Sequence, residues 1–173
     1  MADENKLPAW LVLWLIVASP VVVWDASFLF TRPASLPGGD LHWLFSPYAL
    51  YIEVDGRYAD MSDTFGLAQA YMNVVEVVLS LATVALHFRR DRRARLLGLV
   101  TLMMTWWKTV AYMIQYMDIC NGGDYLAKNT TMSLVFLFLI PNGLWLVFPL
   151  LGIISLWSSL HRSLAVADGK KAR

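Results

Sequence analysis

The stretch HFRRDRRAR, at residues 87–95, separates two long apolar runs that extend over about 65–88 and 96–117. Two more apolar runs lie nearer the ends of the chain, at about 10–30 and 132–160. Each run is long enough to cross roughly 30 Å of hydrocarbon at about 1.5 Å per helical residue. The sequence therefore predicts an all-α membrane protein: a bundle of four transmembrane helices that forms a single domain over residues 10–160.

The composition supports this interpretation and narrows the function. Hydrophobic residues make up 58% of the 173, against about 45–50% in soluble proteins. The first run is not a signal peptide, because the preceding MADENK is not basic, the run is too long and no cleavage motif follows. Pro20 should kink this helix or end its first half. The net charge of +1 gives no reason to expect a nucleic-acid partner, and Cys120, the only cysteine, excludes an intrachain disulfide.

Basic residues predict the orientation of the helices. Five arginines lie in residues 87–95, and the tail at 161–173 contains His161, Arg162, Lys170, Lys171 and Arg173. Four spans place this tail on the same side as the arginines, so the positive-inside rule predicts that both are cytosolic, together with residues 1–9. The loops at about 31–64 and 118–131 are then lumenal. The final KKAR resembles a dilysine retrieval signal, which indicates a multi-pass protein of the endoplasmic reticulum membrane.

The long lumenal loop after the first helix has two interpretations. It contains a Gly38-Gly39 turn signal, and it is rich in Trp and Tyr from residue 41 to 58, as is typical of the membrane interface. On the first interpretation, the loop is an interfacial lid over the bundle. On the second, one of its ionisable side chains reaches into a cavity; the candidates are Asp40, His42, Glu53 and Asp55.

Polar residues within the apolar runs predict which helix faces point inward, because a charge near the bilayer centre costs about 2.5–3.5 kcal/mol. Helical spacing groups them into one stripe per run. The stripes are Trp24 and Asp25; Gln69, Asn73 and Glu76; Thr101, Thr105, Lys108, Tyr112 and Gln115; and Asn142 and Trp145. They can converge only inside the bundle. We therefore expect an amphipathic cavity lined by Glu76, Lys108, Tyr112, Asn142, Trp145 and Asp25.

These residues also have structural explanations. Glu76 and Lys108 could neutralise each other as a buried pair, and Asn73 and Gln115 could join helices by hydrogen bonds. Asp25 could lie at the lumenal interface, where a carboxylate costs little. For Glu76 with the stripe of the fourth run we favour a functional site, because intramembrane ionisable groups are commonly functional.

The chemistry available to such a cavity is limited. The sequence contains no Ser-His-Asp order, phosphate loop, dinucleotide motif or HExxH pattern, so we expect neither a cofactor nor a metal ion. Carboxylates, a lysine, a tyrosine and tryptophans remain. Burial keeps a carboxyl protonated and able to act as an acid, and the face of a Trp ring stabilises a cation. A protonated carboxyl group beside tryptophan rings is suited to protonate an alkene and to stabilise the resulting carbocation.

One stretch resembles a known family. IPNGLWLVFP, at residues 140–149, resembles the last helix of the emopamil-binding-protein family, the EXPERA-domain proteins, with its Asn-x-x-Trp-Leu-x-x-Pro pattern. Glu76 resembles the glutamate of the family's second helix, and residues 108–112 and the loop at 32–51 resemble short fungal-type members. The resemblance implies a four- or five-helix EXPERA bundle in the endoplasmic reticulum. It also implies that Glu76 is an acid/base group, that Asn142 positions the substrate and that Trp145 faces a cation, as in sterol Δ8–Δ7 isomerases.

Two positions differ from those isomerases. They carry a His-x-x-x-Glu pair on an early helix, where this chain has only Asp25, and Lys108 replaces a small residue. A terpenoid or another polycyclic alkene therefore fits as well as a sterol. The candidate catalytic residues are Glu76, Asp25, Asn142 and Trp145; the candidate substrate-binding residues are Lys108, Tyr112, Asn73, Trp107, His42 and Asp40.

Two functions remain open at this point. The first is an intramembrane isomerase or cyclase that works through a carbocation. The second is a non-catalytic protein that binds or transports sterols or lipophilic amines, which the absence of a second carboxylate favours. The expected partners are the lipid bilayer and a hydrophobic polycyclic small molecule, and the sequence leaves a homodimer open. A channel is disfavoured because bulky aromatic residues occupy the stripes.

Overall fold

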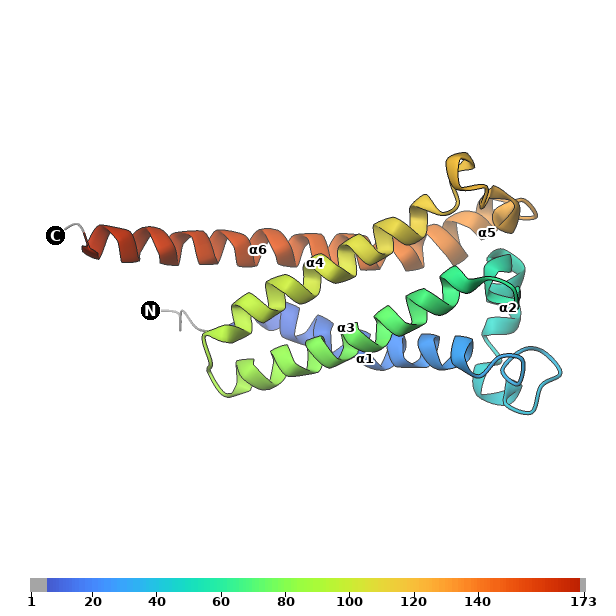
Figure 1. Cartoon of the computed structure of the whole chain (residues 1–173), viewed down its shortest axis with the longest axis horizontal. Helices are drawn as coiled ribbons and strands as arrows, with labels where there is room; N and C mark the ends of the chain where they lie inside the picture. Colours follow the sequence, from blue (N-terminus) through green and yellow to red (C-terminus); the bar gives the residue numbers. More distant parts are fainter. Residues whose placement is uncertain (1–5, 172–173) are drawn as a thin grey trace.

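The protein is a bundle of four long helices closed at one end by a cap, as Figure 1 shows. The computed structural model describes residues 6–171, with side chains up to residue 165. Within that part of the chain the long helices are α1 (Ala9–Phe30), α3 (Thr64–Phe88), α4 (Arg93–Ile114) and α6 (Ile140–Lys171). The short α5 (Thr131–Ser133) and a π-helical segment η5 (Leu134–Leu139) lead directly into α6. Four helices are long and apolar enough to cross a membrane, as the sequence predicted.

Consecutive helices pack against each other in an antiparallel arrangement. The main contacts join α1 to α3, α3 to α4 and α4 to α6. Trp14 also joins α1 to α6, because its ring lies 5.3 Å from that of Trp145 and 4.5 Å from that of Phe148. The start of α1, the end of α6 and the arginine loop (residues 87–95) lie at one end of the bundle (Figure 1). The loops at 31–63 and 115–130 lie at the other end.

Local hydrogen bonds decide where the helices begin. Asp63 caps α3, because its Oδ2 accepts the backbone N–H of Gly66 at 2.7 Å. α4 begins at Arg93, earlier than the predicted run at 96–117, because the carboxylate of Asp91 accepts the N–H of Arg93 at 2.9 Å. α6 continues to Lys171, so the predicted tail at 161–173 begins as helix. The side chains of Lys170 and Lys171, and all of Arg173, lie outside the described residues.

Prolines affect the first and last helices differently. α1 continues through Pro20 without a break, so the expectation that the helix could end there is wrong. Near Pro141 the chain instead forms the π-helical turn η5. A proline lacks an N–H, and its ring crowds the carbonyl four residues earlier; a wider π turn relieves this crowding. The turn sets the rotation of α6 at the point where its polar residues face the bundle.

The cap (residues 31–63) covers the end of the bundle, as the lid interpretation expects. It contains η1 (His42–Phe45), α2 (Tyr48–Val54) and η2 (Gly56–Tyr58). Its aromatic rings pack on α1: the ring of Tyr48 stacks on Phe28 at 4.1 Å. A turn fixes its start, because a Cβ at Gly39 would lie 2.2 Å from the carbonyl oxygen of Ala34. The side chain of Asn129 donates to the carbonyl of Val54 at 2.6 Å and ties the second loop to the cap.

Candidate functional site

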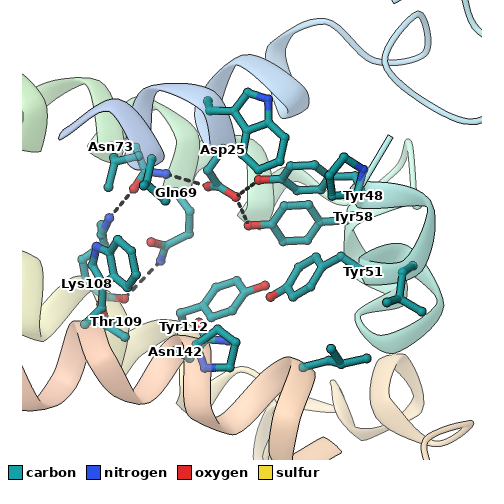
Figure 2. Close-up of a pocket in the computed structure, with 18 residues that line it drawn as sticks. Asp25, Tyr48, Tyr51, Tyr58, Gln69, Asn73, Lys108, Thr109, Tyr112 and Asn142 are labelled. Atoms are coloured by element: carbon teal, nitrogen blue, oxygen red, sulfur yellow. Dashed lines mark hydrogen bonds between the residues drawn. The ribbon is translucent and has the colours of Figure 1, made fainter. Parts of the chain in front are cut away.

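A cavity of about 430 Å³ lies between the four helices and the cap (Figure 2). Most of its lining is aromatic or aliphatic, and its polar groups come from every surrounding element. The apolar residues are Val21, Val22, Trp24, Pro47, Leu50, Leu137, Pro141 and Trp145. The polar residues are Asp25, Tyr48, Tyr51, Tyr58, Gln69, Asn73, Lys108, Thr109, Tyr112 and Asn142. The converging stripes thus enclose an amphipathic cavity, as their spacing predicted.

Asp25 is the carboxylate in the wall of this cavity. Its Oδ1 accepts hydrogen bonds from the hydroxyls of Tyr48 at 2.7 Å and Tyr58 at 2.8 Å. Its Oδ2 accepts one from the Nδ2 of Asn73 at 2.9 Å. Burial and the nearby Asp25 raise the pKa of Tyr48 and Tyr58, so both phenols keep their protons and act as donors. Asp25 is therefore held by α1, α3 and the cap together.

Glu76 lies behind the cavity wall. Its Oε2 is 2.7 Å from the Nζ of Lys108, and both side chains are buried. Lys108 also donates to Asn73, which connects this pair to Asp25. Lys108 lines the cavity and Glu76 does not, which corrects the expectation that Glu76 would line it. Glu76 is almost one helical turn beyond Asn73 along α3, away from the cap, and the long side chain of Lys108 reaches back to it.

A second buried carboxylate comes from the cap. Asp55 has no exposed surface. It accepts hydrogen bonds from the hydroxyls of Tyr112 and of Tyr116, the latter at 2.6 Å. Burial raises the pKa of Asp55, and these hydrogen bonds act in the opposite direction. Tyr112 lines the cavity, where its hydroxyl points toward that of Tyr51 (Figure 2). Asp55 thus connects to the cavity through one phenol.

The other ionisable residues proposed for the loop have no such connection to the cavity. Asp40 and Glu53 are exposed, and His42 is half-buried in η1. None of the three lines the cavity. Asp55 is buried and accepts a hydrogen bond from the lining residue Tyr112, but it does not line the cavity either, so none of the four candidates reaches into the cavity directly.

The two residues of the stripe predicted for the fourth apolar run lie where they were expected. Asn142 and Trp145 both line the cavity from α6. The Nδ2 of Asn142 donates to the carbonyl of Phe138 at 2.9 Å. Trp107, in contrast, is 56% exposed and lies outside the lining. It precedes Lys108 by about 100° of helical rotation, so it points away from the bundle when Lys108 points inward.

An arginine that the sequence analysis did not single out supports the cap. The Nη1 of Arg57 is 2.5 Å from the Oδ1 of Asp63, and both side chains are buried. Its guanidinium also lies 4.6 Å from the ring centre of Tyr125 and 5.2 Å from that of Tyr116. This pair fixes the junction between the cap and α3. No sequence spacing signals it, because Arg57 lies in the three-residue helix η2 and Asp63 in the turn before α3, and both segments are too short to show a periodic pattern.

No family model, curated protein or solved structure matches this chain. The resemblance to the emopamil-binding-protein family therefore stays a prediction, and the function has to be argued from the cavity. Within the described residues, no group of three or more His, Cys, Asp or Glu side chains is arranged to hold a metal ion. The groups that the structure does bring together are two carboxylates, several phenols, one ammonium–carboxylate pair and two tryptophans.

Proposed function

We propose that this protein is an isomerase or cyclase of the endoplasmic reticulum membrane that acts on a sterol-like or terpenoid-like alkene. The observation that carries the proposal is the position of Asp25, whose carboxyl group faces a largely apolar cavity within a membrane-spanning bundle. An ionisable group is costly to bury in such a place, and groups of this kind are commonly functional. The arginine loop, which we expect on the cytosolic side, gives the proposed orientation of the bundle in the membrane.

The cavity suits a hydrophobic molecule of several rings. Its volume of about 430 Å³ lies within the roughly 300–1,000 Å³ of small-molecule sites. Aliphatic and aromatic side chains form most of the wall, and Trp24 and Trp145 present ring systems to it. A ligand of this kind would partition into the bilayer first and enter the bundle from the lipid.

Asp25 would begin the reaction by giving its proton to one carbon of a double bond. The π electron pair forms the new C–H bond, and the neighbouring carbon becomes a cation. The Asp25 carboxylate and the faces of Trp24 and Trp145 would stabilise this cation. Loss of a proton from another adjacent carbon then leaves its C–H electron pair as the shifted double bond. In a cyclase, a second double bond would attack the cation before the proton is lost.

Tyr112 and Asp55 would supply the base for proton removal: the phenol oxygen of Tyr112 takes the substrate proton while its own proton passes to the carboxylate of Asp55. Exchange with water would later remove this proton from Asp55 and return one to Asp25. Tyr112 faces the cavity and is hydrogen-bonded to Asp55. In Figure 2 Tyr112 lies across the cavity from Asp25. A double-bond shift needs a proton to be added at one carbon and removed from another, which two separated groups accommodate better than one. The sequence argument against catalysis, the absence of a second carboxylate, therefore loses much of its weight.

A second function, non-catalytic binding of a lipophilic amine or sterol, is favoured by a different observation. Asp25 accepts three hydrogen bonds, and donors of this kind stabilise the ionised form of a carboxylate. An anion held in an aromatic cavity would bind an ammonium group without turning over a substrate.

Conversion in deuterated water distinguishes the two functions. Microsomes that contain the protein are offered candidate sterols and terpenoids, and the products are analysed for deuterium. An isomerase leaves deuterium at the protonated carbon, and microsomes with the Asp25→Asn variant should not. Saturable binding of the same compounds with no conversion would instead support the binding function.

The predicted topology has its own test. A tag at the C-terminus should be digested by protease in sealed microsomes, because the tail is expected on the cytosolic side. Protection of the tag would contradict the orientation.

A further inference from the structure

Arg95 is a buried cation at the end of the bundle opposite the cap. It is the third residue of α4 and is only 6% exposed. Its Nη1 donates to the hydroxyl of Ser159 at 2.8 Å and to that of Ser163 at 3.3 Å, both on α6. Among the described residues it makes no ion pair with a carboxylate. Two hydroxyls therefore surround a full positive charge that they do not neutralise.

The unpaired donors lie along one edge of the guanidinium. The Nε–H of Arg95 is buried and has no acceptor in the described part of the chain. Its Nη2 makes no hydrogen bond there either, since both bonds of this side chain use Nη1. Nε and Nη2 are the two parallel donors that bind a carboxylate or phosphate side-on. A buried donor without an acceptor is rare in proteins and calls for an explanation.

The surroundings of Arg95 favour an anion from the membrane. Five arginines lie within residues 87–95 with one aspartate, Asp91, which is bound by Arg93 at 2.7 Å. Arg95 lies at the start of a membrane-length helix, so we expect its side chain to lie at the depth of the headgroup region at this end of the bundle. Basic pockets between transmembrane helices at this level bind lipid headgroups.

We infer that Arg95, Ser159 and Ser163 form a binding site for the phosphate group of an anionic glycerophospholipid between α4 and α6. The Nε and Nη2 edge binds two phosphate oxygens, and the serines orient the guanidinium through Nη1. The acyl chains lie along the apolar outer faces of the two helices, where Leu96 and Trp157 are exposed. The site is independent of the cavity and of the reaction proposed there.

Retention of lipid by the purified protein tests the inference. The wild type and the variants Arg95→Gln and Arg89→Gln are titrated in detergent with dioleoylphosphatidylserine or dioleoylphosphatidylcholine, and bound lipid is counted by native mass spectrometry. Arg89 is the matched control, because it is exposed, lies in the same loop and carries the same charge. We expect Arg95→Gln to bind phosphatidylserine at least tenfold more weakly, and Arg89→Gln to stay within twofold of the wild type. Phosphatidylcholine has the same phosphate but also a choline cation that the neighbouring arginines repel, so it should bind more weakly than phosphatidylserine to the wild type and to Arg89→Gln.

Other outcomes overturn the inference. Equal losses in the two variants would mean that only the general positive field attracts the lipid, and unchanged binding by Arg95→Gln would exclude the site. If inorganic phosphate alone displaces phosphatidylserine at similar concentrations, the site takes a free anion and not a lipid. Should Arg95→Gln fail to fold, Arg95→Lys replaces it. That variant keeps the charge but loses the paired donors, so it should bind phosphatidylserine several-fold more weakly, and wild-type affinity would contradict the side-on geometry.

Discussion

The two ends of the bundle are packed in different ways. At the end that carries the arginine loop, the buried residues are aliphatic: Leu7, Leu11, Val12, Leu15, Val84, Ala94, Leu102 and Leu156. At the cap end they are largely aromatic and include Phe28, Phe45, Tyr48, Tyr58, Tyr112 and Phe138. The buried carboxylates Asp25 and Asp55 and the cavity itself lie at the aromatic end. The same four helices thus form a filled core at one end and a hollow, polar-lined chamber at the other.

This difference separates stability from function. The aliphatic end is close-packed, since a Cβ at Gly98 would lie 3.2 Å from Thr83 and 3.3 Å from Leu156. Such close packing of side chains holds the helices together at this end. The aromatic end leaves a cavity and buries ionisable groups away from water. This arrangement stabilises the fold less, but it provides the groups that could react with a substrate. Substitutions at the two ends should therefore separate loss of fold from loss of activity.

The largest effect is expected at the aromatic end, for Asp25→Asn. An amide cannot donate and recover a proton, and acid/base groups contribute about 10²–10⁴-fold to rates. Turnover of a confirmed substrate should fall by at least about 100-fold. Asn is close in shape, and its oxygen still accepts from Tyr48 and Tyr58, but its amide NH2 replaces the acceptor of Asn73, so the thermal unfolding temperature should fall slightly while the fold is kept. Full turnover by this variant would exclude Asp25 as the acid.

Glu76→Gln tests whether the residue first proposed as the acid is instead the partner of Lys108. Loss of one member of a buried ion pair costs about 3–5 kcal/mol, so the free energy of unfolding in detergent should fall by that amount. The double variant Glu76→Gln with Lys108→Met removes the charge left behind and should recover much of the stability. A single variant that keeps its stability but loses turnover would restore Glu76 as the acid/base group.

Gly152→Val should weaken the aliphatic end alone. A Cβ at this glycine would lie 2.7 Å from Leu102 Cδ1 and 3.2 Å from Leu11 Cδ1. Overpacking of this kind costs about 1–3 kcal/mol, and ligand binding in the cavity should not change in the protein that remains folded. Gly143→Val in the same helix is the control, because a Cβ there meets no atom within 4 Å. Equal destabilisation by both variants would show that α6 packs differently.

Trp145→Leu should have the smallest of these effects and should be specific for cations. Leu keeps hydrophobic bulk but lacks the ring quadrupole, so turnover should fall about tenfold, which corresponds to about 1.36 kcal/mol. A cationic amine that mimics the carbocation should lose more affinity than a neutral analogue. The control is Trp14→Leu, which removes the ring that packs against Trp145 from outside the lining. Equal losses for the neutral and cationic ligands would favour the binding function.

Regular helical spacing made part of the site predictable. Gln69, Asn73 and Glu76 were placed on one face of a helix by their intervals, and all three are buried. Asn142 and Trp145 line the cavity for the same reason. The interval between residues within one helix depends only on its pitch, so no knowledge of the other helices was needed. The long apolar runs likewise required helices, because hydrocarbon leaves no other way to satisfy the backbone.

Helical spacing could not predict which carboxylate faces the cavity. Sequence reasoning ranked Glu76 above Asp25, because Glu76 lies near the middle of its run and Asp25 near the end of another. The ranking reverses in the structure, because Lys108 extends to Glu76 while the cap folds over Asp25. The answer depends on how far a lysine reaches and on where an irregular loop lies, and neither follows from spacing.

The sequence by itself determined the number of spanning helices, their alternating course and the inward face of each, because hydrophobicity and helical pitch act along the chain. Only the tertiary structure decided that Asp55 bonds Tyr112, that Tyr48 and Tyr58 hold Asp25, and that Arg95 lies between two serines of α6. These pairs join residues 23 to 68 positions apart in the chain. They form because the relative rotation of packed helices and the course of the cap bring the groups within hydrogen-bonding distance, which no local pattern encodes.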